Sequence, residues 1–300
     1  MSASDDHQTG RRGYLEHLTD DDLAVLARAG GVEPADPGRA LARLRADPRL
    51  VEELLARRDT YLAVLGPPGE HDPFLRVSPF LVFAVAVHRT FDDLGRATFV
   101  QEWAGARQRL PVFGTDELRS FLAEPLRRLF LTELLGSYTH VASGSLWVQT
   151  PRGWRRHRFS ELDLVRLASL LEVLPAEEHA GVYRRLGDLA LFLTGVFPDH
   201  TASRTFRQID VHRLSRAADA AGREALADAL AASGTVGLLE QLGARWYRLA
   251  ARALSGPATG AVQVVDDVAE RFGDARRVLN HLTDRYLFPF RADWFPAPER

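Results

Sequence analysis

The chain has 300 residues, no cysteine, one methionine and a formal net charge of −2 at pH 7. Without cysteine it can form no disulfide, no iron–sulfur or zinc site with thiolate ligands, and no cysteine nucleophile. All 38 of its strongly basic residues are arginine. The lack of lysine excludes Schiff-base enzymes, P-loop nucleotide hydrolases and protein kinases. The near-neutral charge argues against a dedicated nucleic-acid-binding protein, which usually has a strongly basic face.

The amino-acid usage is skewed as a whole. Asparagine occurs once, at Asn280, and isoleucine once, at Ile209, whereas alanine, arginine, glycine and leucine are abundant. This pattern is typical of a GC-rich genome of the actinobacterial type, so an arginine cluster does not show that arginine was selected over lysine. The polar segment 1–13 predicts a disordered tail without a secretion signal. The longest apolar run, 79–87, is far shorter than the roughly 20 residues of a membrane span. We therefore expect a cytoplasmic protein with no membrane partner.

Residues that cap or stop helices predict a chain made mostly of helices. The first helix runs from a capping box at Thr19 to Gly30, and Pro48 and Pro79 each follow a good N-cap residue. In chain order, the predicted helices cover residues 19–30, 48–65, 79–93, 116–125, 125–142, 161–174, 175–197, 238–254 and 260–286.

Apolar residues recur at helical spacing in the longest of these segments. The clearest stripe runs along the last predicted helix and consists of Val265, Val268, Phe272, Ala275, Leu279, Leu282 and Tyr286. Such helices are stable when they bury their stripes against one another. The sequence therefore predicts an all-α fold, a multi-helix bundle of mostly antiparallel helices. We expect one large helical domain over 14–300, with a subdomain boundary near 143–160 as the alternative.

Residues 145–159 depart from the helical pattern. They alternate between polar and apolar residues around a Pro-Arg-Gly turn, which predicts a β-hairpin. A two-stranded ribbon is marginal by itself, so we expect one of its large apolar residues, Leu146, Trp147, Trp154 or Phe159, to pack on helices. Arginines beside tryptophans could also bind RNA or single-stranded DNA. The arginine bias and the net charge favour a solvated hairpin tip instead.

Three residues are candidates for a metal or haem site. His88 follows an apolar run with helical spacing to Leu81 and Val85, so we expect it to point inward. Glu133 and His140 continue the apolar line that begins at Leu118, which places a carboxylate and an imidazole on a core-facing side. The alternative is that His88 is a core histidine with one hydrogen bond, that Glu133 pairs with an arginine, and that His140 ends a helix.

A second set of residues is a candidate for ligand binding. Gly187 and Gly195 lie on one stripe of a helix, so that a ligand or a neighbouring helix can approach closely; close helix packing is the favoured interpretation. Asp188, on the same helix, follows Arg184 by four residues and can pair with it. On the last helix, an i, i+4, i+8 ladder can form a boundary network or line a polar pocket; it consists of Arg276, Asn280 and Asp284.

Two further segments contain histidines and hydroxyls without a recognisable catalytic pattern. They are 199–203, with Asp199, His200 and Ser203, and 210–212, with Asp210 and His212. No Gly-x-Ser-x-Gly motif accompanies them, and no triad order can be drawn. A Gly-x-Gly-x-x-Gly loop, which would indicate a dinucleotide site, is also absent from the sequence.

Residues 183–198 and 272–287 resemble segments of an uncharacterised group of all-helical bacterial proteins of the actinobacterial type. The likeness extends over 74–295. It implies one helical architecture and carries no activity, cofactor or partner.

These observations leave two classes of function open. The first is a soluble, non-enzymatic protein that binds a ligand or another protein, with a small apolar ligand or a protein as partner. The alternative is a metal- or haem-dependent enzyme in a helical bundle, using His88, Glu133 and His140. The sequence specifies no cofactor.

Overall fold

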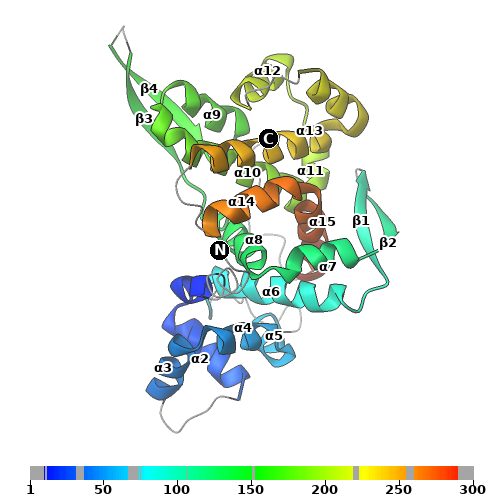
Figure 1. Cartoon of the computed structure of the whole chain (residues 1–300). Helices are drawn as coiled ribbons and strands as arrows, with labels where there is room; N and C mark the ends of the chain where they lie inside the picture. The colour runs from blue at the N-terminus through cyan, green and yellow to red at the C-terminus, as the bar shows by residue number, and fades with distance from the viewer. Residues whose placement is uncertain are drawn as a thin grey trace. The chain divides into compact units, whose positions relative to one another are not determined.

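A computed structural model describes residues 10, 12–31, 37–66, 74, 76–105, 107–150, 153–218, 223–254 and 260–289 (Figure 1). The all-α prediction is confirmed, because helices dominate and the strands of the described residues form two separate two-stranded antiparallel sheets. Most of the predicted tail, 1–13, lies outside the described residues. None of the described helices has the length and apolar character needed to span a membrane.

Contacts within the chain define two compact units. Among the described residues, the first unit comprises 10–101, 111–139 and 281–289, and the second comprises 102–110 and 140–280. One boundary, between Thr139 and His140, falls just before the segment 143–160 in which the sequence placed a subdomain boundary. The prediction of a single domain over 14–300 stays a prediction.

The first unit is built around one buried helix. Its elements are α2 (Asp20–Ala29), α3 (Pro37–Ala46), α4 (Pro48–Ala56), α5 (Arg58–Val64), α6 (Pro79–Leu94), α7 (Asp116–Ala123), α8 (Pro125–Ser137) and the π-helical turn η4 (Thr283–Leu287). Helix α6 begins where the Ser78 side chain accepts a hydrogen bond from Leu81 N at 3.2 Å, with Pro79 next in the chain. It is apolar on all sides and contacts α4, α5, α7 and α8. Burial of α6 therefore organises the core of this unit.

Several boundaries in the first unit differ from the predicted ones. The predicted helix 48–65 is two helices, because Arg57 is extended and its Nη1 donates to Gly30 O at 2.6 Å. Helix α3 has no predicted counterpart. Helix α8 ends at Ser137 and not at 142. Thr115 does not cap α7 with its side chain, since its hydroxyl donates to Ala97 O at 3.1 Å.

The second unit contains the longest helices. Its elements are β3 (Ser143–Thr150), β4 (Gly153–Ser160), α9 (Leu164–Ala168), the 3₁₀ turns η2 (Ser169–Glu172) and η3 (Ala176–Glu178), α10 (His179–Val196), α11 (Pro198–Ser203), α12 (Gln208–Ala217), α13 (Arg223–Ala253), α14 (Gly260–Glu270) and α15 (Phe272–Leu282), whose last two residues belong to the first unit. Helix α13 packs along α10 and also contacts α14. It is interrupted at Gly234, whose φ of 61° lies in the left-handed region that favours glycine.

The predicted helices of this unit are present with shifted bounds. Helix α9 begins at its N-cap Asp163, so the predicted helix 161–174 becomes a short α-helix followed by a 3₁₀ turn. The predicted helix 260–286 is interrupted at Arg271 and changes to a π-helical turn after Leu282. The apolar stripe of this segment is nevertheless buried from Val265 to Tyr286, as predicted.

The predicted hairpin is confirmed as β3–β4, in a register that pairs Ser145 with Arg158. Trp147 is 64 % exposed, so it does not supply the packing expected of the ribbon, whereas Phe159 is half-buried. The turn residue Arg152 and the side chains of Arg155 and His157 lie outside the described residues.

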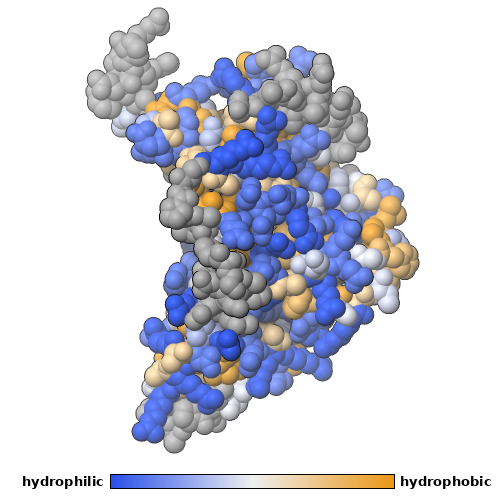
Figure 2. Space-filling model, viewed as in Figure 1, coloured by the Kyte–Doolittle hydropathy of each residue, from blue (hydrophilic) through white to orange (hydrophobic). Residues whose placement is uncertain are grey.

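A second hairpin, β1 (Phe99–Gly105) with β2 (Gln108–Phe113), has no predicted counterpart. Its turn contains Arg107 with a φ of 57°. Figure 2 shows a hydrophobic area over this hairpin, where Phe99, Leu110 and Phe113 are exposed.

Candidate functional site

His88 occupies the buried position that the sequence predicts. Its Nε2 lies 3.2 Å from the Tyr14 hydroxyl, and the two rings are 5.5 Å apart. Burial, together with the nearby Arg128 charge, holds the pKa of His88 well below its usual value. The environment therefore favours a neutral imidazole with one hydrogen-bonding partner, as expected for a core histidine.

Glu133 and His140 do not lie on the core-facing side that the sequence predicts. Glu133 is 37 % exposed and lies 3.1 Å from His17 Nε2, while His140 is exposed beyond the end of α8. The predicted line fails because the chain breaks between α7 and α8 at Glu124, which changes the helical phase after Leu122. Among the described residues, no group of three histidine, aspartate or glutamate side chains is placed to hold a metal. The structure gives no support to the three-residue metal site.

Asp188 has internal partners on two sides. Its Oδ1 accepts hydrogen bonds from Arg184 Nε at 2.9 Å and from the Tyr247 hydroxyl at 2.8 Å. The neighbouring Gly187 allows this approach, because a Cβ there would lie 2.5 Å from the Tyr247 ring. Asp188 therefore joins α10 to α13, and the predicted pair with Arg184 is present.

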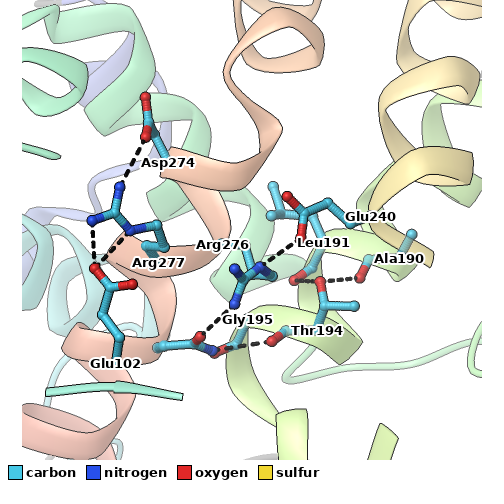
Figure 3. A network of polar contacts seen from close by, with 10 residues as sticks. Glu102, Ala190, Leu191, Thr194, Gly195, Glu240, Asp274, Arg276 and Arg277 are labelled. Atoms are coloured by element: carbon cyan, nitrogen blue, oxygen red, sulfur yellow. Dashed lines mark hydrogen bonds and ion pairs between the residues drawn. The ribbon is translucent and has the colours of Figure 1, made fainter. Parts of the chain in front are cut away.

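Asn280 caps the end of α10. Figure 3 shows the polar network there, with Thr194, Gly195 and Arg276 labelled. Asn280 Nδ2 donates to the carbonyls of Thr194 at 3.0 Å and Gly195 at 2.6 Å. Both carbonyls belong to the last turn of α10, where helical carbonyls have no partner within the helix. Asn280 Oδ1 in turn accepts from Arg276, which also bonds to Glu240 at 2.9 Å. These polar atoms are used within the protein.

Arg277 follows Arg276 on α15 and forms a separate group of ion pairs, which Figure 3 also shows. It pairs with Glu102 on β1 at 2.5 Å and with Asp274 at 3.5 Å. Its role is to hold a strand residue and its own helix together. The predicted ligand-binding residues Asp188, Arg276 and Asn280 thus form contacts between helices, and none of them lines either of the two cavities described below.

Asp284 does not continue the predicted ladder. The α-helix ends at Leu282, and Asp284 lies in the π-helical turn, which shifts the phase away from a four-residue repeat. The same turn carries Tyr286, whose hydroxyl donates to Asp93. Burial and the Asp93 carboxylate raise the pKa of Tyr286 to about 12.

An open cleft of about 790 Å³ lies in the second unit. We call it the arginine cleft. The described residues that line it come from the start of α9, from α11, from the segment 204–207 and from α12; they are Asp163, Val165, Arg166, His200, Ser203, Arg204, Thr205, Phe206, Arg207, Asp210 and Arg213.

Local structure fixes the cleft walls. Asp163 caps α9 by accepting hydrogen bonds from Val165 N and Arg166 N. The Arg204 carbonyl, at the end of α11, accepts a hydrogen bond from the Thr235 hydroxyl at 2.7 Å, which fastens the segment 204–207 to α13. Ser203 donates to His200 O at 2.7 Å, so the Ser203 hydroxyl is not poised as a nucleophile.

The cleft contains more positive than negative charge, and two of its arginines have no carboxylate partner. Arg166 pairs with Asp163 at 3.2 Å, and Arg207 pairs with Asp210 at 3.0 Å. Among the described residues, the Arg213 guanidinium has no ion pair or hydrogen bond. Arg204 Nη1 is buried without a hydrogen bond, and its guanidinium lies 5.8 Å from the centre of the Phe206 ring. This arrangement presents donors for an anion.

Part of this site is recognisable in the sequence. Segments 199–203 and 210–212 stood out for their histidines and hydroxyls, and three of their residues line the cleft. The arginines at 166, 204, 207 and 213 did not stand out, because arginine is the chain's general basic residue. Only the lack of a carboxylate near two of them distinguishes them, and that is a property of the fold.

Comparisons with known protein families, with curated proteins and with solved structures find no match for this chain. The resemblance to a group of helical bacterial proteins stays a prediction. Function has to be argued from the geometry of the arginine cleft.

Proposed function

We propose that this chain is a non-enzymatic binding protein whose second unit takes an anionic ligand in the arginine cleft. The observation that carries the proposal is the pair of unmatched guanidinium groups, Arg204 and Arg213, in one cleft. Guanidinium groups bind carboxylates and phosphates through two parallel hydrogen bonds, which suits an anion of either kind.

The paired arginines of the cleft are also able to exchange partners. The Arg207 side chain is 81 % exposed, so its pair with Asp210 contributes little to stability. An anion entering the cleft can take hydrogen bonds from Arg207 at small cost.

The size of the cleft also suits a small molecule. Its volume of about 790 Å³ lies within the range of small-molecule sites, roughly 300–1,000 Å³.

The comparison with other arginines in this unit supports the proposal. Arg184, Arg185, Arg276 and Arg277 each pair with a carboxylate at 2.5–3.1 Å. The arginine-rich composition explains why arginine occurs at these positions. It does not explain why two arginines that line one cavity form no ion pair among the described residues.

The test is calorimetric titration of the full chain with pyrophosphate at low salt. We expect saturable binding at one site that weakens strongly as salt is raised, because the attraction is between charges in a cleft that is open to solvent. Replacing both arginines (R204Q/R213Q) should weaken binding about tenfold or more, since a charge-assisted hydrogen bond contributes about 1.5–3 kcal/mol.

Arg248→Gln is the matched control. Arg248 is an exposed arginine on α13 that does not line the described cleft. The R248Q variant should bind pyrophosphate with the same affinity as the unaltered chain. Absence of binding at low salt, or equal weakening in R248Q, would refute the proposal.

A further inference from the structure

A second, smaller cavity of about 190 Å³ lies in the same unit. We call it the side pocket. Its described lining residues come from α9, η2, the start of α10 and the end of α12; they are Ala168, Ser169, Leu171, Glu172, His179, Tyr183, Arg213, Arg216 and Ala217. Arg213 lines both cavities, so the side pocket and the arginine cleft are neighbours that share one guanidinium-bearing side chain.

The chemistry of the two cavities differs. The arginine cleft is lined mostly by charged and hydroxyl groups. The side pocket has an apolar wall formed by Leu171 and Ala217 and an aromatic wall at Tyr183. Arg216 and Glu172 pair with each other, so Arg213 is the charged lining residue that forms no ion pair among the described residues. His179 Nε2 donates a hydrogen bond to Leu174 O at 3.0 Å, and its ring meets the Tyr183 ring edge-on at 6.0 Å between centroids.

The size of the side pocket limits what it can hold. An apolar cavity of about 150 Å³ accepts benzene, so about 190 Å³ suits one ring or a short branched chain. The arginine cleft next to the side pocket has room for an anionic group and the linker between the two.

We infer that the ligand is a small organic anion that carries one aromatic ring, with its carboxylate or phosphate beside Arg204 and Arg213 and its ring in the side pocket. This inference rests on the proposed anion-binding function and names the class of ligand. Burial of the ring supplies affinity that is independent of salt. The arginines supply the charge match and fix the end of the molecule that enters the cleft.

The experiment compares acetate with phenylacetate, 3-phenylpropionate and 4-phenylbutyrate by calorimetric titration of the full chain. We expect at least one of the ring-bearing acids to bind at least tenfold more tightly than acetate. The neutral analogue 3-phenylpropan-1-ol should bind at least tenfold more weakly than 3-phenylpropionate. The length of the best linker then reports the separation of the two subsites.

Ala217→Leu, which fills the side pocket, should remove the advantage of the ring and leave pyrophosphate binding unchanged. Leu171→Gln provides a second variant if A217L does not fold. Ala253→Leu, at an exposed position near the end of α13, is the control and should retain the advantage.

The outcomes separate the two proposals. Pyrophosphate binding without any gain from the ring overturns the inference and leaves the anion-binding function standing. Binding of neither pyrophosphate nor the acids overturns both. A gain from the ring that persists in A217L and L171Q places the ring elsewhere and overturns the inference. The same titration with an acidic peptide that contains one phenylalanine is a further test. If this peptide binds at least tenfold more tightly than every ring-bearing acid, the ligand is a peptide and the inference is overturned.

Discussion

Asn280→Ala should destabilise the protein by about 3 kcal/mol. Asn280 is 2 % exposed, and its amide is the partner of two helix-end carbonyls, those of Thr194 and Gly195. Each buried polar group left without a partner costs about 1–3 kcal/mol. Arg276 loses only one of its contacts, because it keeps Glu240. The two carbonyls therefore account for most of the loss.

Urea unfolding followed by far-ultraviolet circular dichroism measures this change. With a slope of about 3 kcal/mol per molar urea, the midpoint should fall by about 1 M. Gln241→Ala is the matched control: it also removes an amide, from an exposed position on α13, and should change the free energy of unfolding by less than about 0.5 kcal/mol.

Asn280→Asp tests the direction of the hydrogen bonds. It keeps an acceptor for Arg276 but replaces the donor amide with an oxygen that faces two carbonyl oxygens. We expect it to be at least as destabilising as Asn280→Ala. A stable N280D, or an N280A that loses less than about 0.5 kcal/mol, would show that Asn280 does not cap α10.

Three further predictions can be measured in the same way. Gly195→Ala should cost about 1–3 kcal/mol, because the added Cβ would lie 2.7 Å from a leucine of α15. Gly181→Ala, which has open space around it, should stabilise the protein by about 0.5–1 kcal/mol. The reverse order of the two variants would refute the packing argument. Arg128→Met should cost about 3 kcal/mol or more, because it removes a buried ion pair with Glu52 and the donor to the carbonyls of Leu122 and Ala123, and a loss below about 1 kcal/mol would contradict this. The lowered pKa of His88 means that the unfolded chain binds a proton more readily than the folded one, so stability is complete above about pH 6.5 and falls as the pH drops below it. His88→Gln should remove about 1 kcal/mol of the difference between pH 7 and pH 5.5, and an unchanged difference would rule the argument out.

The sequence predicts most of the helices because their signals are local. Ser78 and Pro79 start α6, and the stripe from Val265 to Tyr286 identifies the buried face of the last segment. Helix breaks were harder to predict. Arg57 leaves the helical conformation to donate to Gly30 O, a residue 27 positions away, and no local signal reports that contact.

The candidate residues show the same division between local and long-range information. The rarity of asparagine drew attention to Asn280, and its position beside the core stripe was readable from spacing. Its partners on α10 lie 85 and 86 positions away, so the sequence alone did not separate a ligand-binding amide from a helix cap. The prediction that Glu133 faces the core was wrong for another reason. The apolar stripe was continued across Pro125 as if one helix ran through it, but α7 ends at Ala123 and α8 begins at Pro125.

Arg128 and Asn280 point to a common rule for the buried polar side chains of this chain. Arg128 donates to the carbonyls of Leu122 and Ala123 at the end of α7, as Asn280 does at the end of α10. Both satisfy helix-end carbonyls that would otherwise be buried without partners. The donor atoms that these two side chains give to helix-end carbonyls are therefore not available to a ligand.

The same rule sharpens the case for the arginine cleft. In a chain whose only strongly basic residue is arginine, the residue type says nothing about function, and the partner becomes the informative quantity. Arginines that meet carboxylates or helix ends have a structural role. Arg204 and Arg213 meet neither within the described residues, and both line the arginine cleft. A guanidinium at a cavity wall that has no carboxylate partner in the protein can bind an anion from solution. We therefore expect the anionic partner of Arg204 and Arg213 to be a bound ligand.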